Sequence, residues 1–274
     1  MKTALEMRLA QDFLGIPEVW GTVHSKFRRT VNLAFPGRLI TLALEEIPGL
    51  PDSITVSREL LEELRQVPEG TPVVKRDLLF GLDGKIPLFS LEGAELQPDA
   101  MPTLQQPVSA RRMAAAAMPF LEDSGFFRMP PALREELFRR LSAFCRSLSC
   151  GGSEEALLSC AGMGCGLTPS SDDALVGILA AQAGGILPES RRINPRILWR
   201  TLEGRTTWVS RKYLCCAAEG RFSQPLRALF EEPSPDALEL RLKAAAAVGS
   251  TSGRDTLTGI VLACRFRKME ERNA

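Results

Sequence analysis

Short runs of apolar, β-branched and aromatic residues, separated by turn residues, fill the first 96 positions of the chain. Runs of this kind predict β-strands, here at residues 19–27, 29–35, 39–44, 54–56, 72–75, 78–80 and 86–90. Asp83-Gly84 between the last two runs is a hairpin signal. One helix is predicted at 58–66, because Ser57 is a suitable N-cap for a mixed Glu/Arg segment. We expect residues 1–96 to form a small β-rich domain.

Prolines at positions 98, 102 and 107 interrupt the next stretch of the chain. Such punctuation marks loops between periodic segments, so residues 97–109 are predicted to be a linker. The remaining residues, 110–274, have mainly helical patterns, at 110–118, 132–148, 154–160, 170–184, 196–202, 207–219, 236–248 and 252–269. The predicted fold class is therefore α+β, with a helical domain after the β-rich one.

A glycine loop followed by an apolar helix is the strongest local signal in the helical part. Alternating glycines at 162, 164 and 166 allow a tight turn and the close approach of another group. Thr168 is expected to be the N-cap and Pro169 the first helical residue. A helix start after such a loop can present backbone N–H groups to a ligand.

The same pattern returns near the C-terminus, at 249–260. Without gaps, Asp255 aligns with Asp173 and Ser252 with Ser170, and the Asp-x-Leu-x-Gly-Ile pattern is shared. Two such copies, each with a Gly/Ser/Thr loop and an apolar helix, indicate a structural arrangement that occurs as a pair. Our hypothesis is that the two helix starts face each other across one cleft.

The acidic residues at these helix starts allow three interpretations. Asp172 and Asp173 can complement the helix dipole, bind a metal ion such as Mg²⁺, or act as a general base. Two adjacent aspartates, echoed by Asp255, exceed what capping requires, although a purely structural role stays open. Arg254 can bind phosphate or carboxylate at the second helix start, or pair with a neighbouring acid.

His24 is the only histidine, so any acid–base catalysis by an imidazole must use it. On a strand, His24, Lys26 and Arg28 would share one face, which could hold a phosphate or carboxylate. The alternative is a basic strand edge that prevents edge pairing. Because neighbouring side chains on a strand face opposite sides, Ser25 and His24 are not expected to form a catalytic triad.

The amino-acid composition indicates which general kind of protein this is. The chain has 274 residues, of which 45% are hydrophobic and 24% charged, with a net charge of +1. This balance is typical of a soluble globular protein and gives no general attraction to nucleic acid or membranes. A charged beginning, with Glu6 and Arg8, does not match a signal peptide, so the expected location is cytoplasmic. Seven cysteines with a single histidine give little support for a zinc site.

Three blocks of sequence resemble the AllH-like family, long catalogued as a domain of unknown function. They are Gly-x-Gly-Leu-Thr-Pro-Ser-x-Asp-Asp at 164–173, Val-His-Ser-x-Phe-Arg-Arg-x-Val-Asn-Leu at 23–33, and Thr-Ser-Gly-x-Asp-Thr-Leu-x-Gly at 251–259. One departure is Ser171, where the family pattern leads us to expect glycine.

The resemblance implies a subunit of oxamate carbamoyltransferase, a multi-subunit enzyme of anaerobic allantoin use. That enzyme moves a carbamoyl group between oxalurate and phosphate, giving oxamate and carbamoyl phosphate. The chain lacks the Ser-Thr-Arg-Thr signature of aspartate and ornithine carbamoyltransferases, so any such chemistry would be built differently.

The leading hypothesis is a carbamoyltransferase-type subunit that binds a small carboxylate, carbamoyl or phosphate ligand between the glycine-started helices and the β-rich domain. The candidate catalytic residues are His24, Asp172, Asp173 and Asp255. The candidate ligand-binding residues are Ser25, Arg28, Asn32, Gly164, Gly166, Thr168, Ser170, Ser252, Gly253 and Arg254. Mg²⁺ is a candidate cofactor, and protein partner subunits are expected. The competing hypothesis is a non-catalytic ligand-binding or assembly subunit whose glycine loops pack helices.

Overall fold

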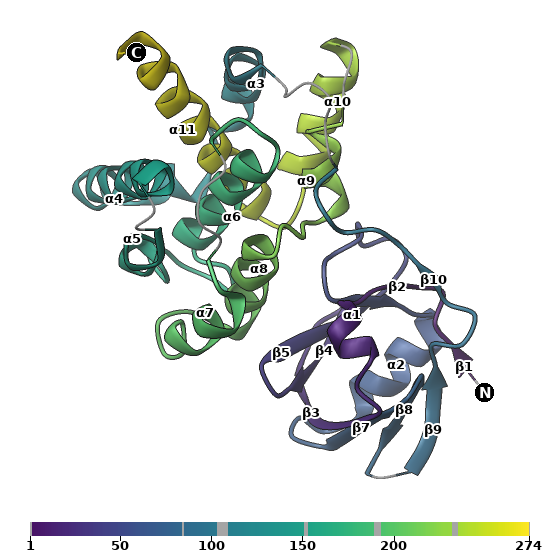
Figure 1. Cartoon of the computed structure of the whole chain (residues 1–274). Coiled ribbons are helices and arrows are strands. Elements are labelled where there is room, and N and C mark those ends of the chain that lie inside the picture. Colours follow the sequence, from purple (N-terminus) through teal and green to yellow (C-terminus); the bar gives the residue numbers. More distant parts are fainter. Residues whose placement is uncertain are drawn as a thin grey trace. The chain divides into compact units, whose positions relative to one another are not determined.

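The computed structural model describes residues 2–83, 85–102, 109–150, 153–188, 193–231 and 235–273. The chain divides into two compact units, Met1–Asp99 and Ala100–Ala274 (Figure 1). The first is rich in strands and the second is mainly helical, which confirms the α+β class. Residues 103–108 of the predicted linker and Gly84 of the predicted hairpin lie outside the described residues.

A single curved sheet forms the first unit, with strand order β1-β9-β8-β7-β3-β4-β5-β6-β2-β10. The strands are β1 Lys2–Thr3, β2 Glu6–Arg8, β3 Glu18–Lys26, β4 Thr30–Phe35, β5 Arg38–Ala43, β6 Ser53–Thr55, β7 Pro72–Arg76, β8 Leu79–Leu82, β9 Lys85–Ser90 and β10 Glu95–Leu96. Two antiparallel meanders, β3–β4–β5 and β7–β8–β9, meet where β3 pairs with β7. The longer strands match the predicted runs. The strands β1, β2 and β10 and the short helix α1 (Gln11–Leu14) were not predicted, because elements of two to four residues carry no periodic pattern.

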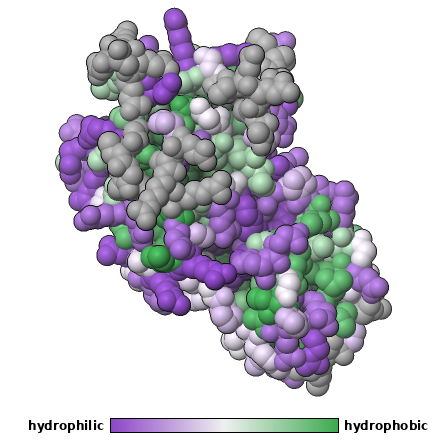
Figure 2. Space-filling model, viewed as in Figure 1, coloured by the Kyte–Doolittle hydropathy of each residue, from purple (hydrophilic) through white to green (hydrophobic). Residues whose placement is uncertain are grey.

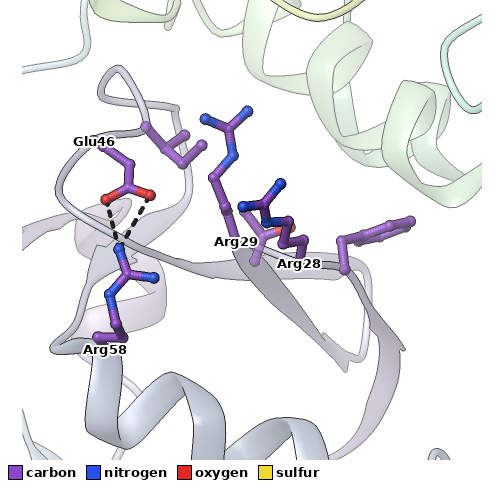
Figure 3. A pocket seen from close by; sticks show the side chains of 7 residues that line it. Arg28, Arg29, Glu46 and Arg58 are labelled. Atoms are coloured by element: carbon purple, nitrogen blue, oxygen red, sulfur yellow. Dashed lines mark hydrogen bonds and ion pairs between the residues drawn. The ribbon is translucent and has the colours of Figure 1, made fainter.

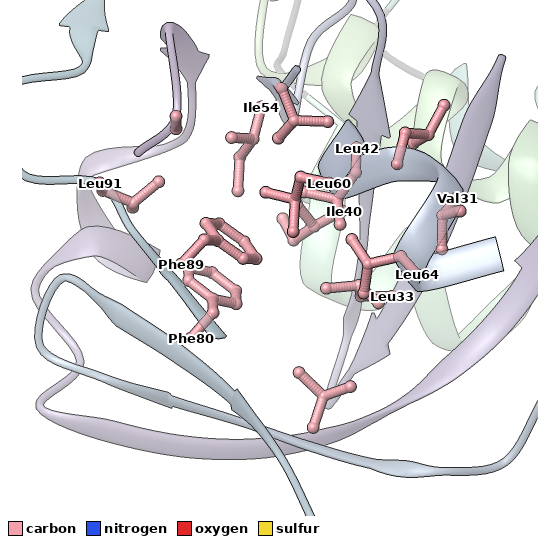
Figure 4. Close-up of a cluster of buried hydrophobic side chains, with 14 of the residues drawn as sticks. Val31, Leu33, Ile40, Leu42, Ile54, Leu60, Leu64, Phe80, Phe89 and Leu91 are labelled. Carbon is pink, nitrogen blue, oxygen red and sulfur yellow. The ribbon is translucent and has the colours of Figure 1, made fainter. Parts of the chain in front are cut away.

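Helix α2 (Arg58–Gln66) closes the core of this unit and confirms the predicted helix. The Ser57 hydroxyl caps it by accepting a hydrogen bond from the Leu60 N–H at 3.2 Å. Figure 4 shows Leu60 and Leu64 of α2 among sheet side chains such as Ile40 and Leu42. Each fully buried leucine of this kind contributes about 1.5–3 kcal/mol through the removal of apolar surface from water.

The second unit is a helical assembly. Its helices are α3 Ala110–Ala117, α4 Pro131–Cys150, α5 Ser153–Cys160, α6 Ser170–Ala183, α7 Pro195–Thr201, α8 Trp208–Ala218, α9 Gln224–Ala228, α10 Pro235–Ala246 and α11 Ser252–Asn273, with short 3₁₀ turns η1 at Met118–Phe120 and η2 at Gly125–Arg128. Figure 1 shows α6 in the middle of this unit, and α4, α5, α8 and α11 all contact it. Nearly every position of α6 is buried, as its apolar sequence predicts.

The helices α6 and α11 cross with their backbones almost touching. A Cβ atom on Gly177 would lie 2.0 Å from the Thr256 carbonyl oxygen, and a Cβ on Gly259 would lie 2.0 Å from the Ala174 oxygen. Gly177 and Gly259 are equivalent in the two sequence copies, and so are Ala174 and Thr256. The crossing is therefore reciprocal, and only glycine fits at either position.

None of the described helices combines the length and the apolar character that a bilayer span requires. Figure 2 shows hydrophilic side chains over much of the face in view, with hydrophobic patches between them. Large apolar side chains that are exposed in the β-rich unit are Leu5, Ile16, Trp20, Leu78 and Leu96.

Gly177→Ala and Gly259→Ala should each destabilise the helical unit by about 1–3 kcal/mol, because the added methyl group would force two backbones apart. Urea unfolding followed by circular dichroism measures the loss. Gly15→Ala is the control, because Gly15 has a right-handed helical φ of −71° and a Cβ there would only reach 3.4 Å from its nearest neighbour. Equal stability of the Gly177 and Gly15 variants would contradict the crossing.

Candidate functional site

The two helix starts exchange side-chain interactions. Asp173 of α6 interacts with Ser252 of α11, and Asp255 of α11 interacts with Ser170 of α6. These are equivalent pairs in the two sequence copies, so the exchange has an approximate two-fold symmetry. The hydroxyl oxygens of Thr168 and Ser252 are also 2.7 Å apart, which joins the loop before α6 to the start of α11. The structure thus brings the two predicted helix starts together.

Both exchanged carboxyl groups are buried. Asp173 is 7% exposed and Asp255 is 0% exposed. The Asp255 Oδ1 atom accepts a hydrogen bond from the Gly125 N–H at 2.7 Å, whereas Oδ2 of either aspartate has no hydrogen-bond partner among the described residues. A buried carboxylate without full hydrogen bonding is costly, so the neutral acid is favoured.

The pKa of Asp173 is raised well above the ordinary range of a carboxyl group. Burial is the main cause, the nearby Asp255 raises it further, and the hydroxyl groups of Thr168 and Ser252 offset part of the increase. Burial also raises the pKa of Asp255, against the lowering effect of Ser170 and Thr251. Burial therefore favours the neutral form of Asp173 over its carboxylate.

Asp172 points into the glycine loop instead of toward the exchanged pair. Its Oδ1 accepts from the Gly162 N–H at 2.7 Å, and its Oδ2 accepts from the Thr206 hydroxyl. Ser171, the departure from the family pattern, lies in the first turn of α6 and its hydroxyl accepts from the Met163 N–H at 2.8 Å. The serine is therefore accommodated in helical backbone and helps to hold the loop.

The predicted cap of α6 is wrong in detail. The helix begins at Ser170, so Pro169 occupies the N-cap position and no side chain caps the helix. Thr168 lies one residue too early, and its hydroxyl contacts Ser252 of the other helix instead. The local preference of threonine for the N-cap gave way to a contact 84 positions away in the sequence.

Residues 164–167, which lie between Met163 and Thr168 in the glycine loop, are exposed. Gly164 and Gly166 have φ angles of 128° and 97°, and a Cβ on Gly164 would lie 2.6 Å from the Ser170 nitrogen. Within the described part of the chain, the N–H groups of residues 164–167 donate to no protein acceptor. Exposed, unpaired N–H groups at a helix start can bind the oxygens of an anion or a carbonyl group.

At the second helix start, the contacts of Gly253 and Arg254 are with the chain itself. Gly253 is buried against α10, since a Cβ there would lie 2.0 Å from the Ala245 oxygen. Arg254 donates to the Ser250 carbonyl at 3.2 Å. Among the described residues, no His, Cys, Asp and Glu side chains form a group of three or more that could hold a metal ion.

The predicted residues of the β-rich unit form a polar chain across three strands. The Ser25 hydroxyl lies 3.1 Å from His24 Nδ1 and accepts from Asn32 Nδ2 at 3.0 Å. Asn32 Oδ1 in turn accepts from the Thr41 hydroxyl at 2.7 Å. The expectation that His24 and Ser25 face opposite sides is wrong, because a bulge shifts the register between Val23 and Ser25.

The predicted basic face is also wrong. Strand β3 ends at Lys26, so Arg28 lies in the turn before β4 and not on the strand. Lys26 donates to the Arg65 and Val67 carbonyls near the end of α2, at 3.1 and 2.9 Å. Because β3 lies inside the sheet between β7 and β4, edge protection does not explain these charges.

Sequence reasoning missed two partners of the aspartates, Gly125 and Thr206. Gly125 contacts Asp255 across 130 positions and Thr206 contacts Asp172 across 34. Neither has a local motif, so no sequence signal could have identified them.

These features define a class of protein. It has a strand-rich unit and a helical unit, and in the helical unit buried carboxyl groups of two equivalent helix starts contact hydroxyl groups of each other's helix. Two family models match the chain. Oxamate carbamoyltransferase subunit AllH matches residues 160–264, which include both helix starts, and the AllH family N-terminal domain matches residues 3–94. The chain belongs to the AllH family. No solved structure was found to match it.

Asp173→Asn should stabilise the protein near pH 7 and lose this advantage near pH 4. The folded-state pKa is raised, so the stability that the neutral acid confers is complete below the unfolded pKa and is lost as the pH rises through the folded value. Thermal unfolding from pH 4 to 8 should show that the melting temperature of the variant exceeds that of the wild-type chain by an amount that grows with pH, to several degrees. The exposed Asp123→Asn is the control, and parallel curves for both variants would contradict the inference.

His24 should titrate below the ordinary imidazole pKa of 6.5, because burial lowers its pKa more than Glu69 raises it. As the only histidine, it gives one set of imidazole signals, which nuclear magnetic resonance can follow from pH 4.5 to 8. Its folded pKa is lowered, so its contribution to stability is present above 6.5 and decreases as the pH falls. Glu69→Gln should move the titration lower still. A midpoint at or above 6.5 would refute the assignment.

Proposed function

We propose that this chain is a carbamoyltransferase-related subunit that binds a small carboxylate or carbamoyl ligand at the paired helix starts. The family match supports the first part of the proposal. The observation that carries the second part is the row of N–H groups at 164–167, which have no acceptor among the described residues, beside the joined hydroxyl groups of Thr168 and Ser252. Carboxylate and carbamoyl oxygens are acceptors for such donors, and the hydroxyl oxygens can accept from a carbamoyl NH₂ group.

Aspartates at a helix start would ordinarily repel an anionic ligand. Here burial raises the pKa of Asp173 and Asp255, and Asp172 is occupied by the loop. A raised pKa favours the neutral acid, which weakens the repulsion between these side chains and an anion at the helix start. Addition to a carbamoyl carbon places negative charge on its oxygen, and preorganised N–H donors stabilise such charge.

The second candidate function is a non-catalytic ligand-binding or assembly subunit. Two observations favour it: Asp172 is engaged by the loop that it holds, and Gly253 is required for packing against α10. The family description also names a subunit, which implies protein partners. The exposed apolar side chains of the β-rich unit, such as Trp20 at 48% exposure, are suitable for such a contact.

Thermal-shift titrations with oxamate, oxalurate and carbamoyl phosphate, each with and without Mg²⁺, test the proposal. Binding at a hundredfold excess over the dissociation constant stabilises the folded state by about 2.7 kcal/mol. We expect a saturable shift with at least one ligand, independent of Mg²⁺. Thr168→Val and Ser252→Ala should each raise the dissociation constant about tenfold, as loss of one hydrogen bond to a charged group does.

Thr201→Val is the matched control, because the hydrogen bonds of the Thr201 hydroxyl to described residues all lie within its own helix α7. A shift that survives both site variants would place the ligand elsewhere. Absence of any shift would favour the assembly subunit, and co-purification with a partner would then replace ligand titration as the test.

A further inference from the structure

The β-rich unit has a pocket whose residues the function proposed above does not use. Its volume is about 520 Å³, and it is lined by Phe27, Arg28, Arg29, Thr30, Glu46, Ile47 and Arg58. The two consecutive arginines come from the turn between β3 and β4, and Arg58 is the first residue of α2. Figure 3 shows Arg28 and Arg29 extending from this turn beside the Glu46–Arg58 pair.

The charges in this pocket are not balanced. Arg58 Nη2 lies 3.1 Å from Glu46 Oε2, whereas the guanidinium groups of Arg28 and Arg29 make no hydrogen bond or ion pair with any described residue. Three guanidinium groups and one carboxylate leave two excess positive charges. The Arg58–Glu46 pair is well exposed, and exposed pairs of this kind are weak, so Arg58 can turn to another anion.

Two structural roles, protection of a sheet edge and filling of the core, do not account for the Arg28 and Arg29 side chains. The turn joins two interior strands, so the arginines protect no sheet edge. They fill no core, because both are exposed. Guanidinium groups bind oxyanions with two parallel hydrogen bonds, and the start of α2 adds a favourable dipole beside Arg58.

We propose that this pocket is a binding site for a small oxyanion of charge −2, held by Arg28, Arg29 and Arg58. Inorganic phosphate and a dicarboxylate such as oxalate share this chemistry. The site belongs to the β-rich unit alone and is independent of the ligand proposed for the helix starts.

Isothermal titration calorimetry with inorganic phosphate and with oxalate, at constant ionic strength, tests the proposal. Saturable binding of either anion is expected, and the tighter of the two identifies the preferred group. Arg28→Gln combined with Arg29→Gln should weaken binding at least tenfold, since charge-assisted hydrogen bonds are lost. Glu46→Gln should strengthen binding, because it removes the carboxylate that competes for Arg58.

Two matched variants separate this site from other effects. Arg139→Gln and Arg140→Gln together remove the same charge from α4, where both arginines pair with Glu136, and should leave binding unchanged. Thr168→Val should weaken only binding at the helix starts and leave intact the binding that the Arg28/Arg29 variant removes, which distinguishes the two sites. Equal weakening by the α4 variant, absence of saturable binding, or binding of poly-glutamate in preference to both small anions would overturn the proposal.

Discussion

The reciprocal crossing of α6 and α11 is the constraint on which the helical unit depends. Gly177 and Gly259 let each backbone touch a carbonyl of the other helix, and no larger residue fits. Asp173 and Asp255 each precede these glycines by four residues, about one helical turn. A close crossing therefore fixes the two helix starts beside each other, and the exchange of Asp173 with Ser252 and of Asp255 with Ser170 follows from it.

Burial of the Asp173 and Asp255 carboxyl groups at this close helix contact costs free energy. Each carboxyl group loses water, and one oxygen of each finds no hydrogen-bond partner among the described residues. Burial raises the pKa of Asp173 and so favours its neutral form. Burial also raises the pKa of Asp172, but the hydrogen bonds that Asp172 accepts from Thr206 and Gly162 offset part of this cost. Adjacent aspartates in one helical turn thus have different physical roles. The glycine loop gains its shape from Asp172, and its N–H groups at 164–167 have no acceptor among the described residues.

The sequence predicts the longer elements well, because periodic apolar patterns and Ser57 act locally. It also predicts the pairing of the helix starts, since the repeat at 249–260 requires only comparison of the chain with itself. The cap at Thr168 and the face of His24 could not be predicted. Each was decided by a contact between distant segments: Ser252 attracts Thr168, and the bulge in β3 turns Ser25 toward His24. Local preferences of less than about 2 kcal/mol are easily overruled by such packing.

The family block at 23–33 combines two kinds of residue that a one-dimensional pattern cannot separate. Ser25 and Asn32 bond to each other and, through Thr41, tie three strands together inside the sheet. Arg28 and Arg29 lie between them in sequence but in an exposed turn, with no internal partner among the described residues. Buried polar chains fix strand register, because an unpaired member would be costly. The guanidinium groups of Arg28 and Arg29 have no hydrogen bond or ion pair with the described residues, which agrees with the proposal that they bind an anion.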